Sequence, residues 1–297
     1  MAYPQHVPVL LEESIELLNI RPGSVVLDAT LGLAGHSMAI ARLLGASGRL
    51  IAFDRDEQAM AVAKTNFEKL AEELGSRMPV VEFVARPFSE AAEVVGQGTL
   101  DALLADFGMS SMQLDDAERG FSFRTDGPLD MRMDTRSELT AQQVVNQADE
   151  EDLANMIYEF GEERRSRRIA RAIVRARPIT TTAELARIVS VEASPIKGEK
   201  IHPAARTFQA LRIRVNDELD EIRSVVRAAV DLLKPGGRVV FISFHSLEDR
   251  LVKDGFMEAS RHGLLTILTK KPITANIEET LQNPRSRSAK LRAAYRM

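Results

Sequence analysis

Short apolar runs alternate with longer amphipathic stretches between Ser24 and Asp106. This alternation is typical of strands that are joined by helices in a parallel sheet. The apolar runs predict strands at Val25–Leu27, Arg49–Phe53, Val80–Val84 and Leu100–Ala105. Apolar residues spaced by three and four predict helices at His36–Leu44, Glu57–Leu74 and Ser89–Val95. The N-terminal part of the chain therefore predicts an α/β sheet that is covered by helices.

The strand pattern stops after Asp106 and does not return for about a hundred residues. Ser111–Asp134 is rich in Asp, Gly and Pro and predicts a loop. Thr140–Ile222 predicts helices, with one break near Pro178 and another around Pro195–Pro203.

Strand character returns after Lys234–Gly237, a segment that predicts the end of a helix and a turn. Further strands are predicted at Arg238–Phe244, Leu264–Thr269 and Ala289–Tyr295, with a helix from Leu247. We therefore predict one sheet domain, residues 1–113 and 216–297, interrupted by an inserted helical subdomain, residues 114–215.

The composition is that of an ordinary globular protein. The 297 residues are 44% hydrophobic and 28% charged, which excludes disordered and fibrous classes. There is no cysteine, so disulfides, iron–sulfur clusters and zinc sites of the cysteine type are excluded. The five histidines have no metal-ligand spacing, and we predict no structural metal.

The start of the chain has no basic segment followed by an apolar core, and no apolar run approaches the roughly 18 residues that span a bilayer. A cytoplasmic protein without membrane contact is expected. The net charge of −4 does not indicate nucleic acid. However, residues 161–177 hold seven arginines against two glutamates, and residues 283–297 hold four arginines and a lysine without an acid. Such segments form either solvated helix faces or nucleic-acid contacts.

The ends of the predicted strands carry the candidate chemistry, because ligands of open α/β sheets lie beyond the carboxyl ends of the strands. Asp28 ends the first strand and opens a turn that contains Gly32 and Gly35. The third glycine of a dinucleotide-binding turn is missing, and tight turns need glycine as well. Asp54 ends the second strand, where a carboxylate can bind ribose hydroxyls; the alternative is a helix N-cap. Asp106 ends the fourth strand, or opens a loop as an Asx turn.

A cofactor without phosphates suits this pattern. S-adenosyl-L-methionine offers an adenosine to Asp54, an amino-acid tail to the turn after Asp28, and a positive sulfonium to acidic surroundings. A nicotinamide dehydrogenase is disfavoured by the missing glycine.

Long motifs spread from His6 to Arg292 show a family resemblance. They are residues 6–10, 28–30, 35–37, 106–111, 114–123, 126–134, 161–164, 206–212, 244–250 and 283–288. In these motifs the chain resembles the ribosomal RNA small subunit methyltransferase H family, formerly MraW. The resemblance implies a class I, Rossmann-like S-adenosylmethionine-dependent methyltransferase sheet with an inserted all-helical subdomain. It also implies methyl transfer to the exocyclic N4 of a cytidine in the P-site region of 16S rRNA in the small ribosomal subunit, by a monomer or a homodimer.

The resemblance also implies which residues contact the cofactor. They are Ala34, Gly35, His36, Asp54, Phe88, Asp106 and Gln113. For Phe88 the alternative is ordinary core packing. The chain departs from the family at Ala34, where glycine is usual, and at Pro87, where asparagine is usual. Ala34 affects how closely the turn approaches the cofactor, and Pro87 removes a backbone donor.

Catalysis requires the amine nitrogen in line with the methyl group, and an acceptor for its hydrogens would help. Asp106, or the backbone carbonyls of residues 108–110, are the candidate acceptors. The candidate RNA contacts are Arg164, Arg165, Arg168, Arg171, Arg285 and Arg287, with Arg167, Arg175 and Lys290 nearby. Two alternatives to this function stay open. The protein is a methyltransferase with another RNA or protein substrate, or it is an RNA assembly factor that binds the cofactor without using it.

Overall fold

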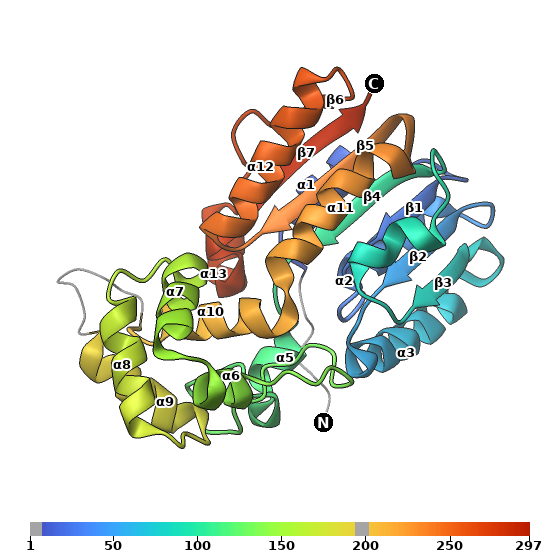
Figure 1. Ribbon diagram of the computed structural model, residues 1–297. Helices are drawn as coiled ribbons and strands as arrows, with labels where there is room; N and C mark the ends of the chain where they lie inside the picture. The colour runs from blue at the N-terminus through green and yellow to red at the C-terminus, as the bar shows by residue number, and fades with distance from the viewer. Residues whose placement is uncertain (1–7, 194–201) are drawn as a thin grey trace. The chain divides into compact units, whose positions relative to one another are not determined.

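The computed structural model describes residues 8–193 and 202–297, and within them the chain packs as two units (Figure 1). The first unit ends at Gly108 and resumes at Leu219, and the second is Met109–Glu218. The domain boundaries expected from the sequence, 113/114 and 215/216, stay predictions. His6, which begins the first family motif, lies outside the described residues.

A seven-stranded sheet forms the centre of the first unit, in the order β3-β2-β1-β4-β5-β7-β6. The strands are β1 Val25–Asp28, β2 Arg49–Phe53, β3 Val80–Val84, β4 Leu100–Asp106, β5 Leu233–Ser243, β6 Leu265–Ile267 and β7 Lys290–Arg296. The first five are parallel, and β7 runs antiparallel to both β5 and β6. The predicted α/β sheet is therefore confirmed.

The strand order reverses between β1 and β4. From β1 the chain moves outward to β2 and β3, then returns to the other side of β1 to form β4 and β5. Asp28 pairs with Leu104 and Asp106 pairs with Ile242, so the carboxyl ends of these strands meet at one edge of the sheet. This switch point is where ligands bind in open α/β sheets.

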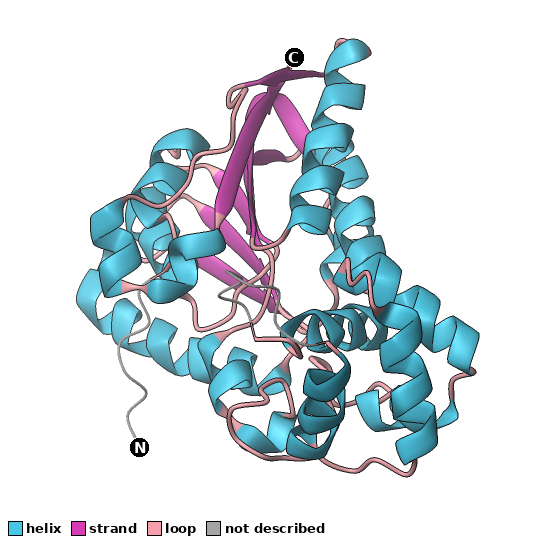
Figure 2. Ribbon diagram, turned by 90° about the vertical axis from the view of Figure 1, so that its left-hand side faces the viewer, coloured by secondary structure: helices cyan, strands magenta, loops and turns pink. Residues whose placement is uncertain are grey.

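Helices cover both faces of the sheet (Figure 2). They are α1 Leu11–Leu18, α2 Gly35–Leu44, α3 Glu57–Leu74, α4 Ala91–Val94, α11 Glu218–Leu232 and α12 Ser246–Arg261. A further short helix, α13 Ile277–Gln282, has no buried residue. Successive residues of β1 enter opposite cores, because side chains alternate along a strand. Val26 packs in the core that contains Ile40 of α2, and Leu27 packs in the core that contains Val225 of α11.

Several elements differ from the sequence prediction. The helix predicted at Ser89–Val95 begins as the 3₁₀ turn Phe88–Glu90, where Ser89 is fixed by hydrogen bonds from its backbone N–H and its hydroxyl to the Glu221 carboxylate. Strand β5 begins at Leu233 rather than after a turn, because residues 234–237 form an irregularity inside the strand. Helices α1 and α13 were not predicted, and a short helix, Ser111–Asp115, forms at the start of the segment predicted as a loop.

The second unit is helical, as expected. Its helices are α5 Ser111–Asp115, α6 Ala141–Gln147, α7 Glu150–Gly161, α8 Ser166–Ala176, α9 Thr182–Glu192 and α10 Ala205–Asn216. The predicted break near Pro178 separates α8 from α9, and most of the break around Pro195–Pro203 lies outside the described residues. Ile157, Ile173 and Leu211 are fully buried in a core of the unit's own. Among the described residues no helix combines the length and apolarity needed to cross a membrane.

Candidate functional site

The turn after β1 is held by the Asp28 carboxylate, which is 1% exposed. Its Oδ2 accepts a hydrogen bond from the Ser37 hydroxyl at 2.6 Å, and its Oδ1 accepts one from the Thr30 N–H at 3.0 Å. Burial raises the pKa of Asp28, although both hydrogen bonds favour the ionised form. Asp28 therefore fixes the shape of the turn that leads into α2.

Ala34 and Gly35 form the tightest part of this turn. Ala34 precedes α2 in the left-handed region, at φ 70°, where a side chain costs roughly 1 to 2 kcal/mol relative to glycine. A Cβ atom on Gly35 would lie 2.4 Å from Cγ of Pro8, so only glycine fits there without a shift. The family's preference for glycine at position 34 thus has a backbone cause, and this chain carries strain there instead.

His36 and Asp106 bring α2 and the end of β4 together. His36 Nε2 lies 3.0 Å from the Val9 carbonyl oxygen, and His36 Nδ1 lies 3.7 Å from Oδ2 of Asp106. The Asp106 N–H donates to the Thr30 hydroxyl oxygen at 2.6 Å. Two of the predicted cofactor residues are therefore neighbours, and the structure adds Thr30 as the link between the turn and β4.

The Asp106 carboxyl is an acid in an unfavourable environment for negative charge. Its side chain is 20% exposed, and its Oδ1 atom is buried without a hydrogen-bond partner among the described residues. Burial raises the pKa of Asp106 well above its ordinary value, and the nearby negative charges of Asp28 and Glu248 raise it further. A cation or a hydrogen-bond donor placed at Oδ1 would relieve this environment.

Asp54 supports the same turn from the end of β2. Its Oδ2 accepts from the Gly32 N–H and its Oδ1 accepts from the Asp56 N–H, each at 2.8 Å. Burial raises the pKa of Asp54 to about 6, against the effect of these hydrogen bonds. The N-cap of α3 is Asp56, which accepts from the Gln58 N–H at 3.0 Å. The alternative that Asp54 is the helix cap is therefore wrong.

Phe88 follows β3 and is partly buried at the sheet edge. Its ring centroid lies 5.8 Å from that of Phe107, the residue after Asp106, with the planes inclined at 46°. Phe88 therefore packs against the core, as its alternative reading expects, and the residue stays partly exposed. Pro87 has φ −63° and ψ 147°, and its carbonyl accepts from the Glu90 N–H at 3.1 Å, so the departure at 87 fits the local backbone.

The end of β5 adds a feature that the sequence prediction did not assign. Oε2 of the fully buried Glu248 accepts from the N–H groups of Phe244 and His245, at 2.6 and 3.2 Å. The Phe244 ring closes over Gly108, where an added Cβ would lie 3.1 Å from Cδ2 of Phe244. A glutamate three residues after the N-cap of a helix, the capping-box spacing, is the signal that could have identified Glu248.

Gln113 belongs to the second unit, where it lies in α5. Its side-chain oxygen accepts from the Ser110 N–H at 3.0 Å, while the Ser110 hydroxyl oxygen accepts from the Gln113 N–H at 3.2 Å. This reciprocal pair caps α5. The contact of Gln113 with a cofactor stays a prediction.

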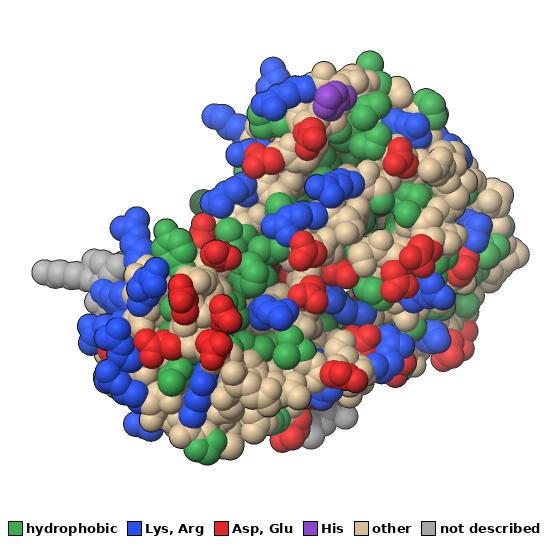
Figure 3. Space-filling view, viewed as in Figure 1, with side chains coloured by type: hydrophobic (Ala, Val, Ile, Leu, Met, Phe, Trp, Pro, Cys, Tyr) green, Lys and Arg blue, Asp and Glu red, His purple; other side chains and the backbone are tan. Residues whose placement is uncertain are grey.

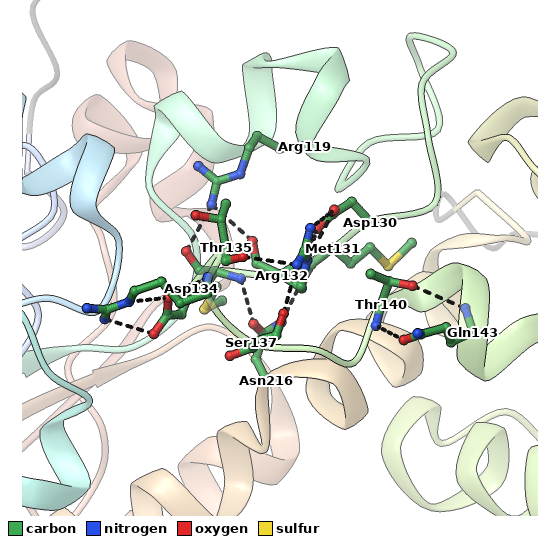
Figure 4. A network of polar contacts seen from close by, with 12 residues as sticks. Arg119, Asp130, Met131, Arg132, Asp134, Thr135, Ser137, Thr140, Gln143 and Asn216 are labelled. Atoms are coloured by element: carbon green, nitrogen blue, oxygen red, sulfur yellow. Dashed lines mark hydrogen bonds and ion pairs between the residues drawn. The ribbon is translucent and has the colours of Figure 1, made fainter.

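A buried polar network fixes the loop before α6 in the second unit (Figure 4). The Asn216 amide accepts from the Met133 N–H and donates to the Met131 carbonyl, both at 2.7 Å. Arg119 donates to the carbonyls of Arg132 and Met133, both at 3.0 Å. A side chain at the end of α10 therefore holds a loop some eighty residues earlier in the chain.

Most of the predicted RNA-binding arginines lie on or beside α8, where Lys and Arg side chains gather on the surface shown in Figure 3. Arg168 forms an ion pair with Glu192, and Arg171 with Glu150 at 3.5 Å. The backbone N–H of Arg165 donates to Glu163 at 2.8 Å. The side chains of Arg164, Arg167 and Arg175 are exposed, with no ion pair to another described residue. Arg285 and Arg287 lie in the 3₁₀ turn Pro284–Ser288 of the first unit.

Comparison with known proteins decides the family. The sequence pattern of the MraW methylase family matches residues 3–297. The chain belongs to the MraW methylase family. The resemblance of the motifs is thereby confirmed over nearly the whole chain.

Two relatives of this MraW-family chain carry the same name. "Ribosomal RNA small subunit methyltransferase H" of Acidobacterium capsulatum is 62% identical over 294 residues, 99% of each chain. The protein of the same name from Koribacter versatilis is 55% identical, over 98% of this chain and 94% of that protein. A solved structure, a putative rRNA-methylase from Clostridium thermocellum, is similar over 98% of this chain and 100% of that chain, at 12% identity with a TM-score of 0.47.

The MraW-family chain thus places five of its predicted cofactor residues around one turn. The end of the turn and the start of α2 are formed by Ala34, Gly35 and His36. Asp54 accepts a hydrogen bond from Gly32 of this turn, and Asp106 faces His36. Asp28, Asp54 and Asp106 thus lie at the carboxyl ends of three adjacent strands, and burial raises the pKa of each carboxyl.

Proposed function

We propose that the protein transfers a methyl group from S-adenosyl-L-methionine to the exocyclic N4 of a cytidine in 16S rRNA of the small ribosomal subunit. The family membership supports the methyl transfer. The names of the relatives support ribosomal RNA of the small subunit as the substrate. The cytidine N4 is the finer part of the proposal and rests on the resemblance of the motifs.

The observation that carries the proposal is the buried Oδ1 of Asp106, which has no hydrogen-bond partner among the described residues. Bound S-adenosylmethionine would bring a positive sulfonium and an activated methyl group to this edge of the sheet. A positive charge near Asp106 would favour its ionised form and lower its raised pKa. The residues at the strand ends therefore fit this cofactor.

Each residue of the turn has a place in the proposed binding. Asp54 would accept hydrogen bonds from the ribose hydroxyls while it keeps those from Gly32 and Asp56, since a carboxylate oxygen can accept more than one. The exposed part of Phe88 would pack against the adenine. Ala34, Gly35 and His36 would lie along the amino-acid tail, as the N-terminal end of α2 suits a carboxylate.

Asp106 is the proposed acceptor for the hydrogens of the cytosine amine. The lone pair of that amine is delocalised into the ring, so a hydrogen-bond acceptor on its N–H groups would make the nitrogen a better nucleophile. Holding the nitrogen in line with the methyl group would lower the activation barrier further, because orientation can contribute about 7 to 11 kcal/mol. Solvent would take the last proton after transfer.

The second unit is the proposed RNA-recognising subdomain. The exposed arginines of α8 are suited to phosphate oxygens, and a target base must leave its stack to reach a methyl donor. Arg285 and Arg287 of the first unit are further proposed phosphate contacts.

The direct test is methyl transfer from labelled S-adenosylmethionine to small ribosomal subunits that lack the modification, with the product nucleoside identified by mass. Label on the N4 of cytidine is expected. Label on another nucleoside would indicate that the protein is a methyltransferase with a different RNA target. Binding of the cofactor without any label would favour an assembly factor.

A further inference from the structure

Three aromatic rings meet in the second unit, apart from the turn and strand ends described above. The Phe123 ring stacks on the His202 ring, with centroids 4.5 Å apart and planes inclined at 23°. Phe208 of α10 supports Phe123 from its edge, at 5.1 Å and 78°. Phe208 is 4% exposed, Phe123 is partly buried and His202 is exposed. The stack therefore runs from the core of the unit to its surface and ends on the histidine.

The His202 ring is fixed in place. Its Nδ1 accepts a hydrogen bond from the Ala204 N–H at 3.2 Å, which puts the ring proton on Nε2. No hydrogen bond joins that Nε2 to another described residue. Since Phe123 covers one face of the imidazole and the side chain is exposed, the ring offers a flat surface and one donor to the solvent.

One positive side chain lies close to this ring in the sequence. Arg206 of α10 follows His202 by four residues and forms an ion pair with Glu163 at 3.4 Å. The other oxygen of Glu163 accepts from the backbone N–H of Arg165, the residue just before α8. Glu163 is only 6% exposed, so it ties the start of the arginine-rich helix to the segment that carries the histidine.

We propose that His202, stacked on Phe123, is a platform for one unstacked base of single-stranded RNA. Single-stranded RNA is bound by stacking its bases on aromatic side chains, histidine included, while arginines hold the phosphates. A ring that is preoriented and backed by a second ring, in a unit whose α8 carries exposed arginines, meets these requirements. The assignment rests on the proposed function, because it takes RNA as the substrate and names a base-binding site within the second unit.

The test compares the full-length protein and its His202→Ala variant in binding two short oligomers. One is oligocytidylate, and the other is an abasic oligoribonucleotide with the same number of phosphates. Loss of a stacked base should weaken the binding of oligocytidylate by roughly 5- to 100-fold. Binding of the abasic oligomer should be unchanged, because its phosphates meet the same arginines.

Two further variants separate stacking from folding. His202→Phe keeps a flat ring and should retain most of the affinity for oligocytidylate. Tyr158→Ala removes another aromatic of the same unit, 59% exposed on α7, and should leave both affinities unchanged. Thermal unfolding of each variant checks that the second unit is intact.

Equal binding of oligocytidylate by the wild type and His202→Ala, or an equal loss on both oligomers, would overturn the platform. Failure of the proposed function looks different. In that case the wild type would not label small subunits, whatever the outcome with the oligomers.

Discussion

The two units use polar side chains in opposite ways. In the first unit the acids at the strand ends are buried or partly buried: the carboxylates of Asp28 and Asp54 accept hydrogen bonds from backbone N–H groups, and the backbone N–H of Asp106 donates to the Thr30 hydroxyl. In the second unit the arginines of α8 are exposed, and the buried Asn216 holds the loop before α6. Buried acids give one fixed geometry for a small cation, whereas exposed arginines adapt to a large polyanion. Substitutions should therefore affect chemistry in the first unit and affinity in the second.

The largest effect is expected from Asp106→Asn. If Asp106 accepts the amine hydrogens, the turnover number should fall by about a hundredfold, with the fold unchanged. The measurement is single-turnover methyl transfer to unmodified small subunits. Asp231→Asn, which changes an exposed carboxylate on α11 of the same unit, is the control and should have wild-type turnover. Wild-type turnover and cofactor affinity in Asp106→Asn would remove this role.

A large loss of stability is expected from Asn216→Ala in the second unit. The substitution leaves the buried Met133 N–H and the Met131 carbonyl without their partner, which should cost about 3 kcal/mol of unfolding free energy. Asn66→Ala, which removes one hydrogen bond to the Leu33 carbonyl in the first unit, should cost about 1 kcal/mol. Urea unfolding measures both. Equal losses would contradict the central role of Asn216.

The raised pKa of Asp54 predicts a pH dependence of stability. Between pH 4 and 6 the unfolded chain releases the proton of Asp54 while the folded protein keeps it, so stability falls as the pH rises through this window. Asp54→Asn lacks this contribution. The unfolding free energy of the wild type should therefore fall relative to the variant by about 2 kcal/mol from pH 4 to pH 7. A difference that does not vary with pH would show that Asp54 ionises equally in both states.

A smaller effect is expected from neutralising two exposed arginines of the second unit. The double variant Arg164→Gln with Arg167→Gln should bind RNA about tenfold more weakly. The slope of log K against the logarithm of the salt concentration should become less steep by about 1.4, the value for two phosphate contacts. Arg42→Gln with Arg49→Gln changes the charge equally at exposed positions of the first unit and serves as the control. The same slope in both double variants would place the RNA contacts elsewhere.

The smallest effect is expected from Ala34→Gly, which removes the strain of a left-handed alanine. The unfolding free energy should rise by about 1 kcal/mol, less the extra entropy of glycine in the unfolded chain. Thermal unfolding measures this change. A loss of stability would show that the Cβ of Ala34 contributes packing that outweighs the strain.

The sequence predicted the elements well where the pattern is local. The first four strands and α3 appear where their apolar residues placed them, since these segments satisfy one periodicity throughout. The exceptions depend on distant partners. Glu221 fixes the 3₁₀ turn at Ser89, and pairing with Leu100 draws Leu233 into β5.

The candidate site was predictable to a similar extent. Strand ends and family motifs identified Asp54 and Asp106, because the topology alone brings such residues to one edge. The contacts of His36 with Val9, of Asp106 with Thr30 and of Asn216 with Met133 connect segments that no local pattern relates. Position along the sequence carries no signal for such contacts.

The placement of the second unit between β4 and β5 has a consequence for biosynthesis. These strands are neighbours in the sheet, yet a chain growing from its N-terminus makes the whole of Met109–Glu218 before β5 exists. Until then the apolar β4 has an open edge, which is a site for wrong pairing. Early folding of the intervening helices would shorten the effective loop and so lower the entropic cost of bringing β4 and β5 together, which grows with the logarithm of the loop length. The helical unit would then act as a folding aid for the sheet during its own synthesis.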